Sequence, residues 1–275
     1  MRHVLSTHLF INHRLTTVWL EKIWQAGIPA VEIFCARQHL DYRDRAQIAE
    51  LGHWFRDSTL TLHSLHSPMY TDEIWGRSGP NSIIDITEPV KAKRLDMLDE
   101  IKRALDIAEI VPFQYLIQHI GVTGAEYDEA RIDAAFASLE EISLFARARG
   151  VEVLLENTQN RLATAERLVL FLQITHLKLG FCFDVGHANM NEGVEAAFRL
   201  MENQIRSTHL HDNDGKSDQH LFPLSGEGTI EWKKTMDLLR TRPDRYPLVL
   251  ELRDAPGVAN PIGAAAELFE KLEGL

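Results

Sequence analysis

The segment Ile205-Arg206-Ser207-Thr208-His209-Leu210-His211-Asp212-Asn213-Asp214-Gly215-Lys216-Ser217-Asp218-Gln219-His220 carries the pattern that decides the fold. Its first part, up to His211, has the composition of a short strand, and its second part is rich in the Asp, Asn, Gly and Ser residues that end strands and form turns. His211 at the predicted strand end, with Asp218 and His220 in the turn, gives one segment three side chains that can bind a metal ion. Taken alone, the segment is equally compatible with a solvated loop that carries surface histidines.

The same alternation of a strand-like run and an amphipathic helical run occurs eight times along the chain. The strand-like runs cover residues 3–9, 29–35, 59–66, 114–119, 151–156, 179–184, 205–211 and 247–252. Apolar residues recur at helical spacing between them, as in the series Leu95, Leu98, Ile101, Leu105 and Ala108. This alternation is typical of parallel βα units. We therefore expect an α/β fold, a single (β/α)8 TIM barrel over residues 1–275, with a metal site at the C-terminal ends of the strands.

The ends of several helices also carry local signals. Gly27 and Gly150 stand directly before predicted strands, where a left-handed residue ends a helix, and Thr16 and Asp128 are candidate N-caps. The longest irregular segment, residues 67–88, is too long for an ordinary connection and is a candidate lid or substrate loop.

The composition indicates a soluble protein that works inside the cell. Hydrophobic residues make up 45% of the 275 residues, and no apolar run is long enough to span a bilayer. Met1-Arg2-His3-Val4 lacks the uninterrupted apolar core of a signal peptide, so we expect a cytoplasmic protein with no membrane partner. Cys35 and Cys182 lie in apolar runs and are expected to pack in the core. The formal charge of −11 makes nucleic acid an improbable partner and leaves a homo-oligomer open.

Predicted strand ends concentrate residue types that bind metal ions. They are His66, His119, Glu156, Asp184 with His187 just beyond it, His211 and Glu251. Glu156 and Glu251 are embedded among leucines and valines, and a buried carboxylate is costly unless it is paired or coordinated. A buried salt bridge to an Arg or Lys is the alternative interpretation. Because several such donors converge, a divalent cation is favoured.

Other polar residues near the strand ends have less certain roles. His209 shares the parity of His211 and is predicted to be a hydrogen-bonded core residue one layer lower, whereas His63 is predicted to face the helices. His8 and Glu32 could line the floor of the pocket, as substrate contacts or as structural pairs. Basic residues that follow the strand ends could bind a phosphate or hydroxyl or belong to a solvated rim; they are Arg37, Arg161, Lys216 and Arg253.

Six short motifs lie at these strand ends. They are Leu155-Glu156-Asn157, Phe183-Asp184-Val185-Gly186-His187-Ala188, His209-Leu210-His211-Asp212-Asn213, Asp218-Gln219-His220, Gly226-Glu227-Gly228 and Leu250-Glu251-Leu252. Together they resemble the motifs of the xylose isomerase-like TIM barrel superfamily, which includes sugar and sugar-phosphate isomerases and epimerases and endonuclease IV, the AP endonuclease family 2. The resemblance extends over nearly the whole chain.

The epimerase branch of this superfamily implies one metal ion bound by Glu156, Asp184, His211 and Glu251. In this branch Glu156 and Glu251 also act as the catalytic acid and base, and His187 contacts the substrate. We expect Lys216, Arg253 and Glu32 to be further substrate-binding residues, with Lys216 at the place where some ketose epimerases have an Arg.

The endonuclease branch implies up to three metal ions. The additional ligands would be His66, His119, His187, Asp218 and His220, and each position holds a matching residue type. The loop from His211 to Asp218 is shorter than in endonuclease IV, and no basic DNA-binding surface is evident.

The function expected from the sequence is therefore that of a metal-dependent enzyme. It would isomerise or epimerise a sugar, a sugar phosphate or a related polyhydroxy acid by removing a proton next to a carbonyl group, with an enediolate stabilised by Zn, Mn, Mg or Co. The alternative enzyme is a zinc phosphodiesterase that acts on abasic sites in DNA. A barrel that only binds a ligand is a third hypothesis, which the complete set of strand-end donors disfavours.

Overall fold

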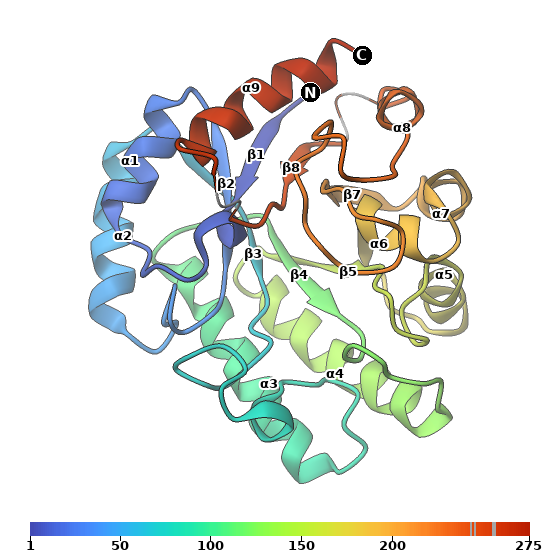
Figure 1. The fold of residues 1–275 in the computed structure, drawn as a ribbon. Coiled ribbons are helices and arrows are strands. Elements are labelled where there is room, and N and C mark those ends of the chain that lie inside the picture. The colour runs from blue at the N-terminus through green and yellow to red at the C-terminus, as the bar shows by residue number, and fades with distance from the viewer. Residues whose placement is uncertain (243, 245, 255–256) are drawn as a thin grey trace.

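The computed structural model of the chain describes residues 1–242, 244, 246–254 and 257–275 (Figure 1). Its strands are β1 (His3–Ser6), β2 (Ala30–Phe34), β3 (Thr61–His66), β4 (Tyr115–His119), β5 (Glu152–Glu156), β6 (Gly180–Asp184), β7 (Ile205–His209) and β8 (Leu248–Leu250). Its α-helices are α1 (Thr17–Gln25), α2 (Arg45–Asp57), α3 (Lys91–Leu105), α4 (Glu129–Arg147), α5 (Ala165–Ile174), α6 (Val185–Met190), α7 (Val194–Met201), α8 (Trp232–Leu239) and α9 (Pro261–Glu273). Short 3-10 helices are η1 (Thr7–Phe10), η2 (Gly79–Ser82) and η3 (Asp106–Glu109).

The strands form one parallel sheet that closes into a barrel with the helices around it. The sheet has the order β7-β6-β5-β4-β3-β2-β1-β8. Just past β7, Leu210 forms a parallel bridge to Leu250 of β8, and Leu210 N donates to Val249 O at 2.8 Å. This contact joins the two edges of the sheet, and the predicted (β/α)8 barrel is confirmed.

Every strand is shorter in the structure than expected, and the differences at β1 and β7 change the placement of two histidines. The chain leaves β1 after Ser6 and turns into η1, because the Ser6 hydroxyl accepts a hydrogen bond from His8 N. Consequently His8 lies on a helical turn and not on a strand. β7 ends at His209, so His211 follows the strand by two residues.

The predicted helix ends at Gly27 and Gly150 and the predicted N-cap at Asp128 are confirmed. Gly27 and Gly150 have φ of 79° and 74°, the left-handed region that glycine adopts without strain. The Asp128 carboxylate caps α4 by accepting from Ala130 N and Arg131 N, whereas the side chain of Thr16 makes no capping bond to α1. One expectation is wrong: Leu95, assigned to the buried face of α3, is 39% exposed.

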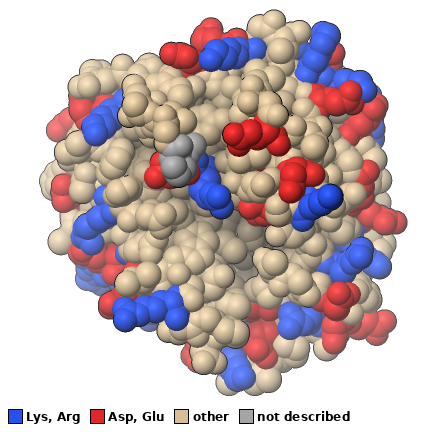
Figure 2. Space-filling model, in the orientation of Figure 1, with Lys and Arg blue, Asp and Glu red and all other residues tan. Residues whose placement is uncertain are grey.

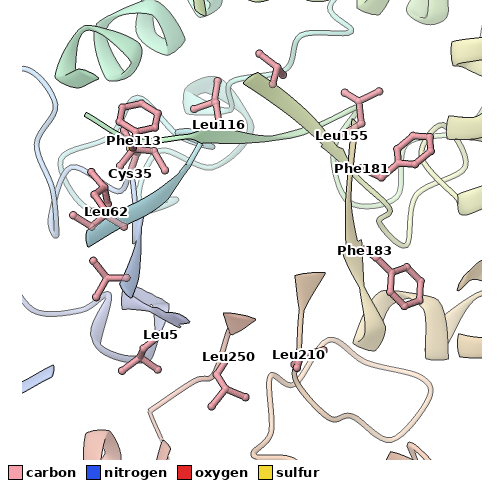
Figure 3. Packing of buried hydrophobic residues seen from close by; sticks show 14 of the residues in the cluster. Leu5, Cys35, Leu62, Phe113, Leu116, Leu155, Phe181, Phe183, Leu210 and Leu250 are labelled. Carbon is pink, nitrogen blue, oxygen red and sulfur yellow. The ribbon is translucent and has the colours of Figure 1, made fainter. Parts of the chain in front are cut away.

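The main apolar core lies between the barrel and the helices. Figure 3 shows Leu116, Leu155, Phe181 and Phe183 pointing away from the ring of strands toward this layer. Cys35 lies in the same layer, while Cys182 is buried in a smaller cluster with residues from β4 and β5. Both cysteines are free and buried, as predicted. Since successive side chains on a strand face opposite sides, outward Leu155 requires Glu156 to point into the barrel.

A bulge in β3 changes which side chains enter the barrel. Val31 of β2 pairs with Leu62 and Glu32 pairs with Ser64, so His63 is an extra residue in the ladder. His63 Nε2 lies 3.3 Å from Ser207 Oγ on β7, across the barrel. The prediction that His63 faces the helices is therefore wrong, because simple alternation does not hold through a bulge.

The long segment 67–88 folds against the mouth of the barrel. It contains η2 and an antiparallel bridge between Tyr70 and Ile83, and the Arg37 guanidinium donates to Thr71 O at 2.9 Å. Trp75 of this segment packs against Phe34 at the end of β2, with ring centroids 5.0 Å apart. A role as a movable lid stays a prediction. Among the described residues, no helix has the length and apolarity needed to cross a membrane.

Candidate metal centre

The strand ends bring the predicted metal-binding side chains to one end of the barrel. All nine predicted donors belong to groups of three or four whose ligand atoms lie within 4.8 Å of one another. Most of these side chains are almost fully buried, and Asp184 and His211 have no exposed surface. No Lys or Arg among the described residues forms a salt bridge with Glu156 or Glu251. The structure therefore does not support the alternative of a simple buried salt bridge.

The first group lies at the ends of β3, β4 and β5. His119 Nε2 is 3.0 Å from Glu156 Oε2, and His66 Nε2 is 3.5 Å from the same oxygen. The two imidazole nitrogens are 3.3 Å apart. Three donors thus converge on one point at the edge of the pocket.

Main-chain carbonyl groups fix the protonation of three histidines. Nδ1 of His66 lies 3.0 Å from Ser67 O, and Nδ1 of His187 lies 2.9 Å from Asn157 O. Nδ1 of His220 lies 2.9 Å from Glu251 O. Because a carbonyl oxygen can only accept, each Nδ1 must carry the proton, and in the neutral ring Nε2 presents a lone pair. This is the orientation that a metal-binding histidine needs.

The Nε2 atoms of His187 and His220 each lie near a carboxylate oxygen of Asp218. His187 Nε2 is 3.2 Å from Asp218 Oδ2, and His220 Nε2 is 3.2 Å from Asp218 Oδ1. Apart from this contact with His220, the buried Asp218 Oδ1 has no hydrogen-bond donor among the described residues. Each of these contacts requires either a second proton on the imidazole or a cation shared by both acceptors. Nitrogen and oxygen donors at this spacing fit a divalent metal ion.

Asp184 and His211 form the deepest part of the centre. His211 Nε2 lies 3.2 Å from Asp184 Oδ2, while Asp184 Oδ1 caps α6 by accepting from His187 N at 2.6 Å. Asn157 braces this strand end, since its side chain donates to Asp184 O and accepts from Asp184 N, both at 2.8 Å. Asn157 is a structural residue that the sequence interpretation did not single out, although it directly follows Glu156.

His209 lies closer to the predicted catalytic carboxylates than His211 does. Its Nδ1 is 3.2 Å from Glu156 Oε1 and 3.1 Å from Glu251 Oε2. Its Nε2 is 3.0 Å from Glu32 Oε1, and Ser64 donates to the other Glu32 oxygen at 2.7 Å. With acceptors at both nitrogens, His209 is placed to carry two protons and to hold the carboxylates from below.

The predicted four-ligand set is therefore not gathered as a single group. Glu156, Asp184 and Glu251 come together with His209, whereas His211 groups with Asp184 and His187 and, separately, with Asp218 and His220. Asp184 belongs to both arrangements. The prediction that His209 is a hydrogen-bonded core residue is confirmed, and the structure adds its contacts with Glu156 and Glu251, which the alternation of side chains did not indicate.

Glu156, which ends β5, and Glu251, which follows β8, have pKa values shifted in opposite directions. Burial raises the pKa of Glu251 to about 8, against the opposing effect of His209 and His220. Burial also acts to raise the pKa of Glu156, but His209 and His119 outweigh it and lower this pKa well below its ordinary value. At neutral pH, one carboxyl group therefore holds a proton and the other is ionised.

The charge of the centre depends on its histidines. Burial opposes protonation of His187, but Asp184 and Asp218 raise its pKa well above the ordinary value. Burial acts to raise the pKa of Asp218, but His220 and His187 outweigh burial and lower this pKa. In this arrangement, protons supply positive charge that a metal ion would otherwise bring.

A pocket of about 270 Å³, the inner pocket, opens above these groups. Its polar wall includes His119, Glu156 and His187, and its apolar wall consists of Phe34, Met69 and Trp75. Phe34 stacks on His66 at 3.9 Å between centroids, so the apolar wall directly touches the metal-binding residues. The sequence signal for this wall was the long 67–88 segment, which indicated a substrate loop without identifying Trp75.

The four predicted substrate-binding residues are distributed differently. His187 and Arg253 line the inner pocket. Glu32 is fully buried beneath it and pairs with His209 and Ser64, so the expected substrate contact is corrected to a positioning role. Lys216 lies outside the inner pocket, in an adjoining hollow lined among others by Tyr127 and Arg161, which we call the outer hollow.

The surface around the mouth is mixed in charge. Figure 2 shows Lys and Arg side chains interspersed with Asp and Glu around a central hollow, with no continuous basic stripe on this face. A protein that tracks a DNA backbone generally presents such a stripe.

The model of the family described as xylose isomerase-like TIM barrel matches residues 20–274. The chain belongs to this family. The xylose isomerase-like barrel also explains why the donors lie at the C-terminal ends of the strands, where barrels of this architecture place their sites.

Relatives in this family include proteins with different names. An uncharacterised protein of Methanocaldococcus jannaschii is 27% identical over 87% of this chain and 80% of its own length. An inosose dehydratase of Yersinia enterocolitica is 23% identical over 46% of this chain and 49% of its own length. A probable endonuclease 4 of Natronomonas pharaonis is 26% identical over 64% and 60%. The chain spans about half the length of another relative, an uncharacterised protein of Sinorhizobium fredii (24% identity over 58% of the chain and 53% of that protein).

Solved structures share the whole barrel. A D-tagatose 3-epimerase-like protein superposes with a TM-score of 0.80 at 22% identity, covering 100% of this chain and 97% of the other. The IolI protein, solved with a zinc atom, has a TM-score of 0.76 at 14% identity and covers 99% and 96%. At these identities the likeness establishes the fold alone.

Proposed function

We propose that this xylose isomerase-like barrel is a divalent-metal-dependent isomerase or epimerase of a sugar, a sugar phosphate or a related polyhydroxy acid. The observation that carries the proposal is the pair Glu156 and Glu251. Both are almost fully buried, both lie at the wall of one small pocket, and one oxygen of each lies within 4.8 Å of the other. The epimerase-like name of a similar barrel supports the same reaction class.

The two carboxyl groups are suited to proton transfer at carbon. Glu156 can accept a proton from the carbon next to a substrate carbonyl, and Glu251, which follows β8 at another point of the barrel mouth, can return a proton. Return to the other face of the same carbon inverts its configuration, and return to the neighbouring carbon moves the carbonyl. Either outcome is compatible with this pair.

The metal would be held by Glu156, Asp184 and Glu251, which come together in one group, and by His211, whose Nε2 lies 3.2 Å from Asp184 Oδ2. When bound, a divalent cation supplies positive charge that favours removal of the carbon-bound proton and stabilises the resulting negative oxygen. Glu32 and Ser64 position His209, and His209 in turn holds the oxygens of Glu156 and Glu251. The fit of the site to a cation rests on the imidazole nitrogens of His187 and His220, which face the two oxygens of Asp218.

The apolar wall and His187 complete the proposed site. Phe34, Met69 and Trp75 cover one side of the inner pocket, which limits the access of water to a transferred proton. His187, whose Nδ1 lies 2.9 Å from Asn157 O and whose Nε2 lies 3.2 Å from Asp218 Oδ2, lines the inner pocket and can contact a substrate hydroxyl.

Exchange of carbon-bound hydrogen tests the proposal directly. Metal-loaded protein is incubated in deuterated water with a panel of ketoses, aldoses, their phosphates and polyhydroxy acids, and each substrate is followed by proton NMR and mass spectrometry. We expect deuterium at a carbon next to the carbonyl of at least one compound. A product lighter by one water would instead identify a dehydratase. No exchange with any compound would refute the proposal.

A second candidate function is that of a phosphodiesterase related to endonuclease IV. The observation that favours it is that all nine donors of a multinuclear site are close together, and one relative is a probable endonuclease 4. The mixed charge of the face in Figure 2 and the narrow, aromatic-walled pocket weigh against a DNA substrate. Cleavage of a duplex with one abasic site, assayed alongside the exchange panel, separates the two functions.

A further inference from the structure

The inner pocket continues into the outer hollow. Thr123, Gln159 and Asp218 line both of them, so a molecule seated at the metal centre can extend past these three residues without leaving the protein surface. Asp218 also belongs to the metal centre. The outer hollow therefore begins at the reacting groups and is not a separate surface feature.

The two spaces differ in size. The inner pocket, at about 270 Å³, lies just below the ~300–1,000 Å³ range of small-molecule sites, so it suits a compact ligand. The outer hollow measures about 850 Å³. A substrate with a single ring would leave this larger space to solvent.

The outer hollow is lined by charged residues of both signs. Its basic residues are Arg161, Arg167 and Lys216. Its acidic residues are Glu126, Glu166, Glu192 and the shared Asp218. Four acidic residues against three basic ones do not favour a phosphate or another anion, whereas they supply donors and acceptors for a neutral group with many hydroxyls.

Several of these groups are available to a ligand. Among the described residues, nothing accepts a hydrogen bond from the guanidinium of Arg161 or the ammonium of Lys216. Tyr127 is 46% exposed, and the Arg167 guanidinium lies 4.4 Å from its ring centroid. This contact fixes the orientation of an aromatic ring whose remaining surface is open. A flat apolar ring beside hydrogen-bonding groups suits a sugar, which has both apolar C–H faces and hydroxyl edges.

We propose that the outer hollow binds a second, uncharged sugar ring, so that the substrate of this barrel is a disaccharide or glycoside whose reacting ring occupies the inner pocket. This inference rests on the proposed function for the identity of the reacting ring. Tyr127 and Arg161 hold the second ring, and neither touches the proposed catalytic carboxylates.

Binding and turnover measured in parallel test the inference. The metal-loaded protein is titrated by calorimetry with a panel of disaccharides and with their component monosaccharides, and the same compounds enter the deuterium-exchange assay. We expect at least one disaccharide to bind ten-fold or more tightly than its monosaccharides. Tyr127→Ala and Arg161→Ala should each remove most of that difference and change monosaccharide binding less than two-fold. Tyr127→Phe, which keeps the ring, should behave as wild type.

The outcomes separate the two proposals. Monosaccharides that bind and exchange as well as every disaccharide would overturn the second-ring site while the isomerase function stands. Tighter binding of sugar monophosphates than of any disaccharide would overturn it in favour of an anion site. A disaccharide that binds through Tyr127, with no exchange in any compound of either panel, would support the second-ring site and refute the isomerase function.

Discussion

An ideal Cβ on Gly186 would lie 2.0 Å from Cε1 of His211 and 2.5 Å from each of its ring nitrogens. The imidazole thus occupies space that only glycine leaves free at this position of α6, and it meets Asp184 there. We expect Gly186→Ala to displace His211, to destabilise the fold by ~1–3 kcal/mol and to reduce bound metal by more than half. Metal analysis of purified protein and thermal unfolding measure these effects.

The double variant provides the control for this effect of Gly186. If Gly186→Ala acts through the ring, adding it to His211→Ala should cost little further stability, because the vacated space accepts the methyl group. Additive losses would mean that the alanine disturbs α6 in some other way.

Metal retention distinguishes His209, which ends β7, from His211, which lies two residues further along the chain. Asp184→Asn and His211→Ala should each lose most of the bound metal, whereas His209→Gln should retain it, since His209 is proposed to position the carboxylates. A chelator should lower the melting temperature of wild type and leave that of His211→Ala nearly unchanged. Full metal content in His211→Ala with loss in His209→Gln would transfer the ligand role to His209.

The number of metal ions depends on His66 and His119. In a mononuclear epimerase these residues shape the pocket beside Glu156, so replacing either by Ala should leave one metal ion per chain. A fall by one from a larger starting number would establish a second metal and favour the phosphodiesterase. Inductively coupled plasma mass spectrometry on protein purified without added metal gives the count.

His39 should make the fold sensitive to mild acid independently of the metal centre. Its ring is fully buried, with Nδ1 2.5 Å from His13 O, and burial lowers its pKa to about 4. In the unfolded chain this histidine binds a proton near pH 6.5, whereas in the folded chain it stays neutral until about pH 4. The free energy of unfolding therefore falls as pH decreases from about 6.5 to 4, by up to ~3 kcal/mol. Urea unfolding of wild type and His39→Asn across this range should give a shallower decline for the variant. Parallel curves would contradict the assignment.

Much of the fold and of the donor set could be predicted because both depend on local patterns. His66, His119, Glu156 and Asp184 are each the last residue of a strand, as expected from apolar runs that stop at a polar residue. Glu251 follows β8 directly. Parallel strands in a barrel all end on one side, so residues far apart in the sequence could be assigned to one centre.

Features that depend on register and on long-range contacts could not be predicted. The bulge that turns His63 inward is visible only from the pairing of β2 with β3. The choice between His209 and His211 depends on the depth at which Glu156 and Glu251 lie, which alternation does not specify. The contact of Trp75 with Phe34 joins a loop to a strand end 41 residues earlier, and no local pattern encodes it.

Glu251→Gln separates proton transfer from metal binding. The amide keeps the size of the side chain and one oxygen donor, so Glu156, Asp184 and His211 should still hold the metal, but it cannot donate or accept the proton that the reaction moves. We expect turnover to fall by ~10²- to 10⁴-fold while substrate affinity changes little. Deuterium exchange on the best substrate of the panel, together with calorimetric binding of the same compound, measures both quantities.

The same variant behaves differently if the protein is a phosphodiesterase. Glu251 would then serve only as a metal ligand, so its replacement should act through weaker metal binding, and added zinc should restore much of the cleavage of an abasic-site duplex. For an isomerase or epimerase, added metal cannot restore the missing carboxyl group. Recovery of activity with excess metal would therefore exclude Glu251 as the acid–base residue, whereas Glu251→Asp should retain partial exchange because it keeps a carboxylate at a shorter reach.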